Sequence, residues 1–318
     1  MKVLIYSRQK IDFWKFPEWV VAELKKEFPD IDFLISYGER PLEELITDAD
    51  ILITSRLTPE EFSRARKLKW IHSPFVGIGN FLFEEFVKSP VKLTNSRGVN
   101  AEAVIIHTIT LALSLLRGIP WAFKLKNERT FNQEFFVKDF FPLEPPEVNV
   151  GIMGFGKIGK GVGKRLKSLG FKVKCLNRSG KKGCFPFEKL DQFLEGIDFL
   201  IITAPRTRLS EGCINYERMK KLNGFIVNTG RGKIIVEKDL VKALREGIIK
   251  GAALDVFESE PLHPESPLWK MPNVIITPHI SGFSRQFWKR ELELIRENLK
   301  RFIQGKRLKN LVNKKLGY

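Results

Sequence analysis

Short apolar runs alternate with amphipathic segments along most of the chain. In the first 97 residues this rhythm predicts strands at 2–6, 31–37, 50–55, 70–73 and 91–95, and helices at 17–27, 41–46 and 59–67. Continuously apolar strands are typical of sheets that are buried on both faces. The alternation therefore predicts a parallel sheet with helices on both sides.

A second series of the same kind begins at residue 148. It predicts strands at 148–153, 171–176, 198–203, 224–228, 251–254 and 274–277, with helices between them such as 237–246. The two series are separated by a long apolar helix at 100–116 and an aromatic segment at 131–146. The helix carries the polar residues His107 and Thr108, which disfavour a membrane span. We therefore expect a helix that is buried in the protein. The aromatic segment lacks periodicity, and we interpret it as an irregular arm or a contact between subunits.

The first strand of the second series runs into a glycine-rich turn. Gly154, Gly156 and Gly159 have the spacing G-x-G-x-x-G, and a helix-compatible segment follows. Gly154 would permit the turn, Gly156 the approach of a pyrophosphate to the backbone, and Gly159 close packing of helix on strand. Helix N-terminal amides favour negative phosphates. Between two predicted strands, this motif predicts dinucleotide binding over the alternative of a merely tight turn.

Three polar segments follow later strands of the same series. They are Asn-Thr-Gly-Arg-Gly at 228–232, Leu-Asp-Val-Phe-Glu-Ser-Glu-Pro-Leu at 254–262, and Thr-Pro-His-Ile-Ser-Gly at 277–282. Open α/β sheets bind ligands at the carboxyl ends of their strands. We therefore expect these segments to lie at the same edge as the glycine turn.

The order and separation of these motifs resemble the D-isomer-specific 2-hydroxyacid dehydrogenases over nearly the whole chain. The resemblance implies a catalytic set of Arg231, Glu260 and His279. Reduction of a 2-keto acid needs a hydride, which nicotinamide carries, and a proton, which a protonated His279 can donate. Glu260 would orient the imidazole ring, and the Arg231 guanidinium would hold the substrate carboxylate and polarise the carbonyl.

Each of these residues has a structural alternative. His279 could be a core histidine, Glu260 a surface carboxylate like its neighbour Glu258, and Arg231 an ordinary ion-pairing residue. The Pro-His, Glu-Pro and Gly-Arg-Gly contexts favour the catalytic roles. The family counterpart of Asp255 contacts the nicotinamide carboxamide, and a plain strand-end carboxylate is the rival interpretation.

The end of the second strand of this series favours NADP(H). NAD-preferring sites usually have an acidic residue there, but this chain has Asn177, followed by Arg178 and Ser179. Arg178 can pair with a 2′-phosphate and Ser179 can donate a hydrogen bond to it, while Lys181 and Lys182 add positive charge. We expect NADP(H) to be preferred, with NAD(H) as the alternative.

The remaining site residues follow from the family pattern. Further expected cofactor contacts are Lys157, Ile158, Thr203, Pro205, Thr229, Gly230 and Gly282. Residues 74–79 resemble the family's loop over the active site, so Val76 and Gly77 are expected to bind substrate together with Arg231 and His279. No metal site is expected.

The resemblance also implies the domain organisation. We expect an α/β chain with two Rossmann-like or flavodoxin-like, doubly wound parallel-sheet domains and a cleft between them. Residues 1–97 with 283–318 would form the substrate-binding domain, and residues 98–282 the dinucleotide-binding domain. A homodimer through the cofactor domains is implied, with residues 101–116 as the expected interface helix.

The Asn-Arg-Ser loop and the ending at 311–318 look most like the glyoxylate/hydroxypyruvate reductase-like branch. The predicted reaction is NADPH-dependent reduction of glyoxylate, hydroxypyruvate or a related 2-keto acid. One alternative is D-3-phosphoglycerate dehydrogenase, which the lack of an extra regulatory domain disfavours. Another is a nicotinamide-sensing regulatory protein, against which the intact catalytic residues argue.

Charge changes this picture little. The net charge is +17, and residues 285–318 hold 11 Lys and Arg against 3 Asp and Glu. Such a surface could suit nucleic acid or a membrane. Leu292, Ile295, Leu299 and Phe302 form an apolar stripe at helical spacing, however, so we expect the charges to cover the outer face of a helix. We expect neither a nucleic-acid nor a membrane partner.

The cysteines indicate the compartment. Cys175, Cys184 and Cys213 are odd in number and scattered, and they form no C-x-x-C pair. The sequence therefore predicts neither a disulfide nor a zinc site, and it favours a reducing cytoplasm.

Overall fold

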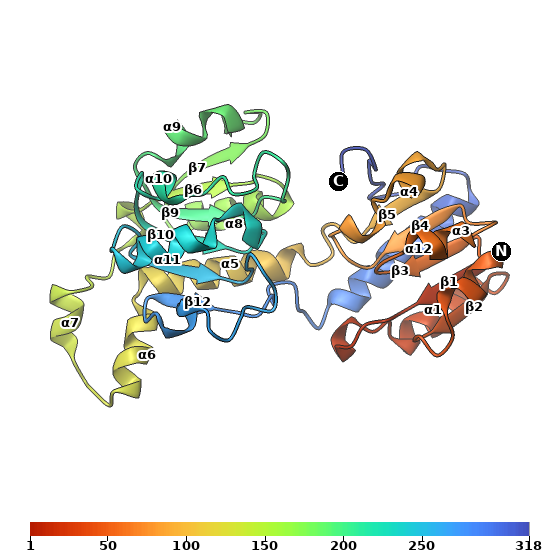
Figure 1. The fold of residues 1–318 in the computed structure, drawn as a ribbon, viewed down its shortest axis with the longest axis horizontal. Helices are drawn as coiled ribbons and strands as arrows, with labels where there is room; N and C mark the ends of the chain where they lie inside the picture. Colours follow the sequence, from red (N-terminus) through yellow and green to blue (C-terminus); the bar gives the residue numbers. More distant parts are fainter. Residues whose placement is uncertain (318) are drawn as a thin grey trace. The chain divides into compact units, whose positions relative to one another are not determined.

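The computed structural model describes residues 1–317 and divides the chain into two compact units (Figure 1). The terminal unit comprises residues 1–100 and the chain from residue 284 onward, and the central unit comprises Ala101–Phe283. The crossings expected after residues 97 and 282 lie three residues and one residue from these boundaries.

The terminal unit is built on a five-stranded, fully parallel sheet with the order β2-β1-β3-β4-β5. This order reverses direction beside β1 and is that of a doubly wound, flavodoxin-like sheet. The strands are β1 (Lys2–Tyr6), β2 (Asp32–Ser36), β3 (Ile51–Thr54), β4 (Trp70–Ser73) and β5 (Lys92–Asn95). The helices are α1 (Glu18–Glu27), α2 (Leu42–Leu45), α3 (Pro59–Ser63), α4 (Glu84–Lys88) and α12 (Phe287–Ile303), with 3-10 turns at Asp12–Trp14, Ile46–Asp48 and Gly79–Phe81.

Helix α12 belongs to the terminal unit because of its apolar stripe. Leu292, Ile295 and Leu299 are buried in one cluster with Val20 and Leu24 of α1, and Phe302 packs against the cluster. The stripe predicted from the sequence is therefore confirmed. On the outer side of the same helix, Arg296 forms ion pairs with Glu23 and Glu27 of α1.

The central unit contains a seven-stranded parallel sheet with the order β12-β11-β10-β9-β6-β7-β8. The strand order reverses between β6 and β9, which is where such sheets bind their ligands. The strands are β6 (Asn149–Met153), β7 (Lys172–Asn177), β8 (Phe185–Pro186), β9 (Ile197–Ile202), β10 (Leu222–Asn228), β11 (Gly251–Leu254) and β12 (Val274–Ile276). The helices are α5 (Ala101–Leu116), α6 (Ile119–Asn127), α7 (Gln133–Lys138), α8 (Lys157–Ser168), α9 (Leu190–Leu194), α10 (Tyr216–Met219) and α11 (Glu237–Arg245), with 3-10 turns at Pro145–Glu147, Phe187–Lys189, Gly232–Ile234 and Pro267–Lys270. The predicted pair of doubly wound α/β sheets is confirmed.

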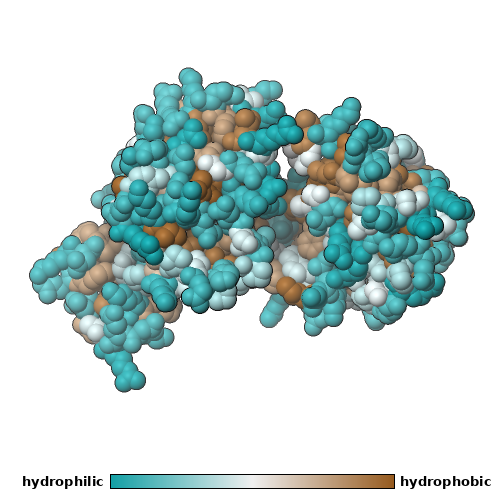
Figure 2. Space-filling view, in the orientation of Figure 1, coloured by the Kyte–Doolittle hydropathy of each residue, from teal (hydrophilic) through white to brown (hydrophobic). Residues whose placement is uncertain are grey.

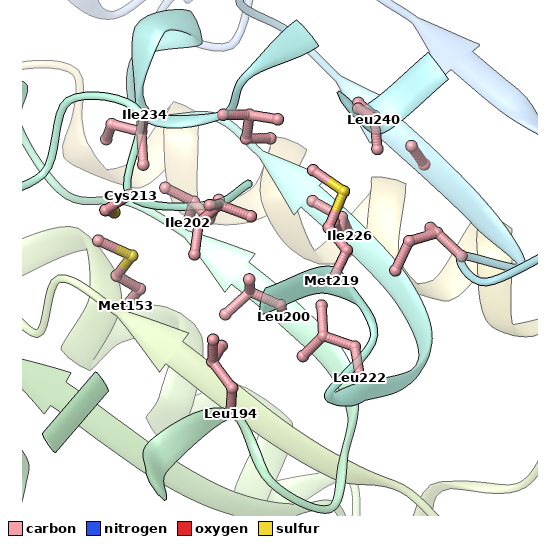
Figure 3. Packing of buried hydrophobic residues seen from close by; sticks show 14 of the residues in the cluster. Met153, Leu194, Leu200, Ile202, Cys213, Met219, Leu222, Ile226, Ile234 and Leu240 are labelled. Atoms are coloured by element: carbon pink, nitrogen blue, oxygen red, sulfur yellow. The ribbon is translucent and has the colours of Figure 1, made fainter. Parts of the chain in front are cut away.

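Both faces of the central sheet are buried. On one face Met153, Ile202 and Ile226 pack with Met219 and Leu240 of the covering helices (Figure 3). Neighbouring residues on the same strands point to the opposite face, where they pack in a second cluster with residues of α5 and α8. Burial on two faces explains why these strands are continuously apolar in sequence.

The aromatic segment between the two series is not wholly irregular, and that prediction is wrong. It contains α7, whose N-cap residue Asn132 accepts a hydrogen bond from the amide of Phe135 at 3.0 Å. Together α6 and α7 project from the body of the central unit (Figure 1). We call residues 119–143 the arm. None of the residues in either of its helices is buried, so the sequence there shows no helical pattern of apolar positions.

The prediction that the cysteines form no disulfide is also wrong. Cys175 of β7 and Cys184, which directly precedes β8, form a disulfide with their Cα atoms 4.7 Å apart. Strand β7 pairs with the two-residue strand β8, which brings together cysteines nine positions apart in sequence. Cys213 is free and buried.

Within residues 1–317 no single helix is long and apolar enough to cross a membrane. Helices α5 and α6 meet the length and composition requirements only as a pair bent by 65°.

Candidate active site

The glycine turn after β6 is held closed by contacts that only glycine permits. Gly154 has a φ of +95°, and a Cβ there would lie 2.5 Å from the backbone of Ala204. A Cβ at Gly159 would lie 2.1 Å from the carbonyl oxygen of Gly154. That carbonyl also accepts a hydrogen bond of 2.7 Å from the Thr203 hydroxyl. Thr203 and Gly159 therefore fix the turn from two sides.

Gly156 is different, because open space surrounds the position that its Cβ would occupy. No atom lies within 4 Å of that position, and α8 begins at the next residue. Open space beside the first amides of a helix fits a pyrophosphate group. The residues present therefore fit a dinucleotide, with Lys157 and Ile158 in the first turn of the same helix.

The loop after β7 is shaped by the side chain of Asn177. Its amide nitrogen donates to the Lys181 carbonyl at 2.8 Å, and its amide oxygen accepts from the backbone of Ser179 at 3.1 Å. Arg178 and Ser179 are exposed. The Asn177 side chain thus stabilises the loop through hydrogen bonds to its backbone. It places no carboxylate at the end of the strand.

The structure brings the predicted catalytic pair into contact. Nδ1 of His279 lies 2.7 Å from Oε2 of Glu260, and Oε1 of Glu260 accepts a hydrogen bond of 3.1 Å from the amide of Phe257. The two side chains are 52% and 36% exposed, so the pair is open on one side within this unit. The Glu258 carboxylate instead accepts a hydrogen bond from the amide of Glu237, and the Glu258 amide donates one to the Glu237 carboxylate, as expected of the structural residue of the two.

The contact between the two residues changes their ionisation. The hydrogen bond to Glu260 raises the pKa of His279 above its ordinary value, against the opposing effect of burial. Burial would raise the pKa of Glu260, but the hydrogen bonds from His279 and Phe257 outweigh it and lower that pKa. The arrangement therefore favours an imidazolium beside a carboxylate.

Arg231 lies between two glycines for a steric reason. A Cβ at Gly232 would lie 1.8 Å from the Phe257 carbonyl oxygen, and one at Gly230 would lie 2.8 Å from that of Ala204. The loop is thus pressed against neighbouring loops on both sides. Burial lowers the pKa of the Arg231 guanidinium, and the charge of Glu260 opposes this effect. The guanidinium itself donates a hydrogen bond of 2.7 Å to the Gly230 carbonyl.

Asp255 holds the segment that carries His279. Its buried carboxylate accepts hydrogen bonds from the Thr277 hydroxyl at 2.6 Å and from the amides of Ile280 and Ser281 at 2.9 and 3.1 Å. The Asp255 carbonyl accepts from the amide of His279, whose φ is +55°. Asp255 has a positioning role here, and its contact with a cofactor stays a prediction.

Two residues of α5 join this cluster that sequence reasoning did not assign to it. Nε2 of His107 lies 3.0 Å from the Thr277 hydroxyl, and the hydroxyls of Thr108 and Thr229 are 2.8 Å apart. Adjacent polar residues within an otherwise apolar helix were the available signal.

The other predicted contacts are spread over both units. Pro205, whose carbonyl accepts from Ser210 at 2.9 Å, and the buried Gly282 lie in the central unit. Val76 and Gly77 follow β4 in the terminal unit, where the Val76 carbonyl accepts a hydrogen bond of 2.9 Å from Asn95. Their contact with a substrate stays a prediction. Within residues 1–317 no three His, Cys, Asp or Glu side chains are grouped to hold a metal ion.

Residues 109–281 match the model of the D-isomer specific 2-hydroxyacid dehydrogenase NAD binding domain. The chain belongs to the D-isomer specific 2-hydroxyacid dehydrogenase family. This dehydrogenase is an oxidoreductase that acts on CH–OH groups, reduces keto acids in the reverse direction and uses NAD(P). The resemblance inferred from the motifs is confirmed.

Similar proteins include glyoxylate reductases of archaea. The dehydrogenase is 31% identical over 316 residues to that of Pyrococcus furiosus, with 94% of each chain covered. It is 34% identical over 276 residues to that of Thermofilum pendens, covering 83% of this chain and 80% of the relative. Among solved structures, the NADPH-dependent glyoxylate/hydroxypyruvate reductase of Sinorhizobium meliloti, in complex with NADP and sulfate, matches with a TM-score of 0.83, 29% identity and full coverage of both chains.

Proposed function

We propose that this dehydrogenase reduces a small 2-keto acid, glyoxylate or hydroxypyruvate, with NADPH. The observation that carries the proposal is the His279–Glu260 contact of 2.7 Å on the loops that follow β11 and β12, with Arg231 on the loop that follows β10 of the same sheet. The similarity to glyoxylate reductases and to a glyoxylate/hydroxypyruvate reductase supports the choice of substrate.

The chain's own residues divide the chemistry as follows. Glu260 holds Nδ1 of His279, so Nε2 is the ring atom that exchanges a proton with the substrate oxygen. Arg231 binds the substrate carboxylate and stabilises negative charge on the carbonyl oxygen. When bound, the nicotinamide supplies the hydride.

The glycine turn would hold the cofactor's pyrophosphate through the backbone at Gly154, Gly156 and Gly159. Lys157 and Ile158 lie in the helical turn that follows, and Thr203 and Gly230 lie against neighbouring parts of the same loops. Pro205, Thr229, Asp255 and Gly282 complete the proposed set on the nicotinamide side.

The preference for NADPH rests on charge. Asn177 stands where an NAD-specific site would have a carboxylate, and Arg178 and Ser179 are exposed at the adjacent turn. A 2′-phosphate carries negative charge, so it favours a cationic loop and is repelled by a carboxylate. The NADP-containing neighbour from Sinorhizobium meliloti supports this choice.

We assign substrate binding to the terminal unit, with Val76 and Gly77 as the contacting loop, and cofactor binding to the central unit. The loop after β4 stands at the carboxyl edge of its own sheet, beside a hollow lined by Ser7, Thr54 and Phe75. Ligands of open α/β sheets bind at that edge.

We also propose a homodimer formed through the central units, with α5 and the arm contributing the interface. Trp121 and Phe140 stack at 4.2 Å and fix the arm to the core, while Phe123, Phe131 and Phe141 are exposed on it. Apolar colour on the arm is visible in Figure 2. Several large apolar side chains exposed on one projecting segment fit a protein interface. We place the reaction in the cytoplasm, where NADPH and small keto acids are available. The disulfide removes the cysteine-based argument for a reducing compartment, so this assignment rests on the proposed reaction and its cofactor.

The test is a set of initial rates with NADPH and NADH, using glyoxylate, hydroxypyruvate, pyruvate and a branched 2-keto acid. We expect glyoxylate or hydroxypyruvate with NADPH to give the highest kcat/KM. Equal kcat/KM with both cofactors would remove the NADPH preference. Faster turnover of the branched acid would remove the assignment of the substrate.

A further inference from the structure

The terminal unit contains a buried histidine and a buried glutamate that the proposed reaction does not use. His72 lies in β4 and Glu291 near the start of α12, and both side chains are fully buried. Nε2 of His72 lies 2.7 Å from Oε1 of Glu291. Their neighbours in sequence, Ile71 and Leu292, are buried apolar residues. Burial of two polar groups in such surroundings is costly unless they are hydrogen-bonded, so their contacts indicate their role.

The histidine is oriented through its other ring nitrogen. Nδ1 of His72 lies 2.8 Å from the hydroxyl of Thr94 in β5, and that hydroxyl accepts a hydrogen bond of 2.8 Å from the Trp70 indole. Because an indole can only donate, the Thr94 hydroxyl can donate its own proton to Nδ1. In that arrangement Nε2 carries the ring proton and donates it to Glu291. Hydrogen bonds thus run from the sheet to the helix.

Glu291 also contacts a residue beside the loop that follows β4. Oε1 of Glu291 accepts a hydrogen bond of 2.8 Å from the Ser96 hydroxyl, which also lies 2.9 Å from the carbonyl oxygen of Ser73. Ser73 is the last residue of β4, and Ser96 directly follows β5. Both serines are buried. The Ser96 hydroxyl therefore lies between the buried carboxyl group and the backbone from which the loop begins.

The residues at the end of β5 hold this loop at two further points. The amide of Ser96 donates to the Phe75 carbonyl at 3.2 Å, and the side chain of Asn95 donates to the Val76 carbonyl at 2.9 Å. Within the loop, the amide of Phe75 donates to the Ser73 hydroxyl at 3.3 Å. Ser96 takes part in two of the three contacts from the end of β5. A displacement of Ser96 would therefore move the loop.

We propose that His72 and Glu291 are positioning residues for the loop after β4. The pair fixes the Ser96 hydroxyl, and Ser96 in turn fixes the backbone that presents Val76 and Gly77. The inference rests on the proposed role of that loop in substrate binding. Small displacements of substrate-positioning groups reduce rates strongly, so loss of the pair should impair catalysis although neither residue touches the substrate. A pair that only fastens α12 to the sheet would contribute to stability alone.

The first test separates these two roles by kinetics. KM and kcat for the keto acid, the Kd for NADPH and the unfolding midpoint are measured for the wild type, Glu291→Leu, Ser96→Ala and the control Asn298→Leu. Asn298 is fully buried on the same helix, but its side chain bonds to the backbone of Lys309. We expect KM to rise about tenfold in Glu291→Leu and in Ser96→Ala, with the NADPH Kd unchanged. Asn298→Leu should lose stability and keep the wild-type KM.

Ser96→Ala removes a single hydroxyl, so it decides the question if Glu291→Leu folds poorly. Glu291→Gln is the conservative variant. Its amide oxygen can still accept hydrogen bonds from His72 and Ser96, so its KM should stay at the wild-type value. A Glu291→Gln protein with the raised KM of Glu291→Leu would show that these hydrogen bonds do not position the loop.

The second test does not depend on the substrate. Hydrogen exchange of peptides that cover residues 73–80 is followed by mass spectrometry in the same variants. Local opening of a loop accelerates exchange of its amides. We expect faster exchange in Glu291→Leu and Ser96→Ala, and the wild-type rate in Asn298→Leu.

The outcomes separate this inference from the proposed function. If the wild type reduces a keto acid with NADPH, and Glu291→Leu and Ser96→Ala keep its KM and exchange rate, the positioning role is wrong and the proposed function stands. If exchange is faster but KM is unchanged, the pair holds a loop that does not bind the substrate, and the inference is wrong. If exchange is faster but the wild type reduces none of the keto acids, the pair holds the loop and the proposed function is wrong.

Discussion

At the scale of single residues, two neighbouring carboxylates have different roles. Glu260 and Glu258 are two positions apart, but only Glu260 contacts His279, while Glu258 bonds to the backbone of Glu237. The sequence alone favoured Glu260 only through the proline that follows it. The structure gives the physical reason, because the carboxylate of Glu260 has one oxygen on Phe257 and the other on the imidazole ring.

The pair predicts a pH dependence. The pKa of His279 is raised, so the proton required for reduction is present at and above the ordinary histidine range and is lost as pH rises through that raised pKa. We expect kcat/KM for reduction to fall on the alkaline side, and kcat/KM for oxidation of the 2-hydroxy acid to rise over the same interval.

Glu260→Gln should move the alkaline limb of the reduction profile to lower pH, because the carboxylate that favours the imidazolium is gone. Glu258→Gln is the matched control and should leave the limb in place. Initial-rate pH profiles of the two variants and the wild type decide the point. A limb that moves equally in both variants would contradict the role of Glu260.

Arg231→Lys tests whether a planar, two-pronged cation is required. Lysine keeps the charge but cannot bind a carboxylate in the same bidentate way. We expect kcat/KM for the keto acid to fall about 10²-fold or more, with the Kd for NADPH unchanged. Wild-type kcat/KM in this variant would exclude Arg231 from the substrate site.

At the scale of elements, the glycines of the turn have separable roles. A Cβ at Gly159 would meet the Gly154 carbonyl at 2.1 Å, whereas a Cβ at Gly156 would meet no atom within 4 Å. Gly159→Ala should therefore lower the free energy of unfolding by about 1–3 kcal/mol. Gly156→Ala should fold as stably as the wild type but bind both cofactors more weakly.

Denaturant unfolding and cofactor Kd values on the two alanine variants measure this contrast. Normal cofactor binding by Gly156→Ala would show that the pyrophosphate does not approach the backbone there. Unchanged stability of Gly159→Ala would show that the turn can yield.

The strands and helices also show which parts of the fold can be predicted from the sequence. Strands such as β4 and β11 were predicted to the residue, because a doubly buried strand is apolar throughout and ends abruptly. The two-residue strand β8 and the helix α7 were missed, since neither has a buried face that leaves a periodic pattern. The Cys175–Cys184 pair depends on the pairing of β7 with β8, which spacing alone does not reveal.

The residues of the site likewise fall into those that the sequence predicts and those that only the structure reveals. The motifs pointed to His279 and Glu260, which are in contact, because both lie, like Arg231, in short segments that follow strands of one sheet. The contributions of His107 and Thr108 come from a helix far away in sequence, so only the packing of α5 against the strand ends reveals them.

At the scale of the whole molecule, the proposed dimer depends on the arm. Phe131 is 93% exposed, which is costly for a large apolar side chain unless another surface covers it. We expect Phe131→Glu to convert the proposed dimer to a monomer, or to raise its dissociation constant. Leu169→Glu, at another exposed apolar position of the central unit, is the matched control.

Light scattering coupled to size-exclusion chromatography reports the masses directly. The wild type and Leu169→Glu should elute at about twice the chain mass of 36.7 kDa. A monomeric wild type would contradict the dimer, and a dimeric Phe131→Glu would remove Phe131 from its interface.

The role of His279 as proton donor is tested by the His279→Ala variant, measured for NADPH-dependent reduction of glyoxylate and hydroxypyruvate and for NADPH binding. We predict that turnover falls about 10²- to 10⁴-fold, as expected for loss of a general acid, while the Kd for NADPH is unchanged. Turnover close to that of the wild type, with cofactor binding intact, would contradict the assignment of His279 as the proton donor.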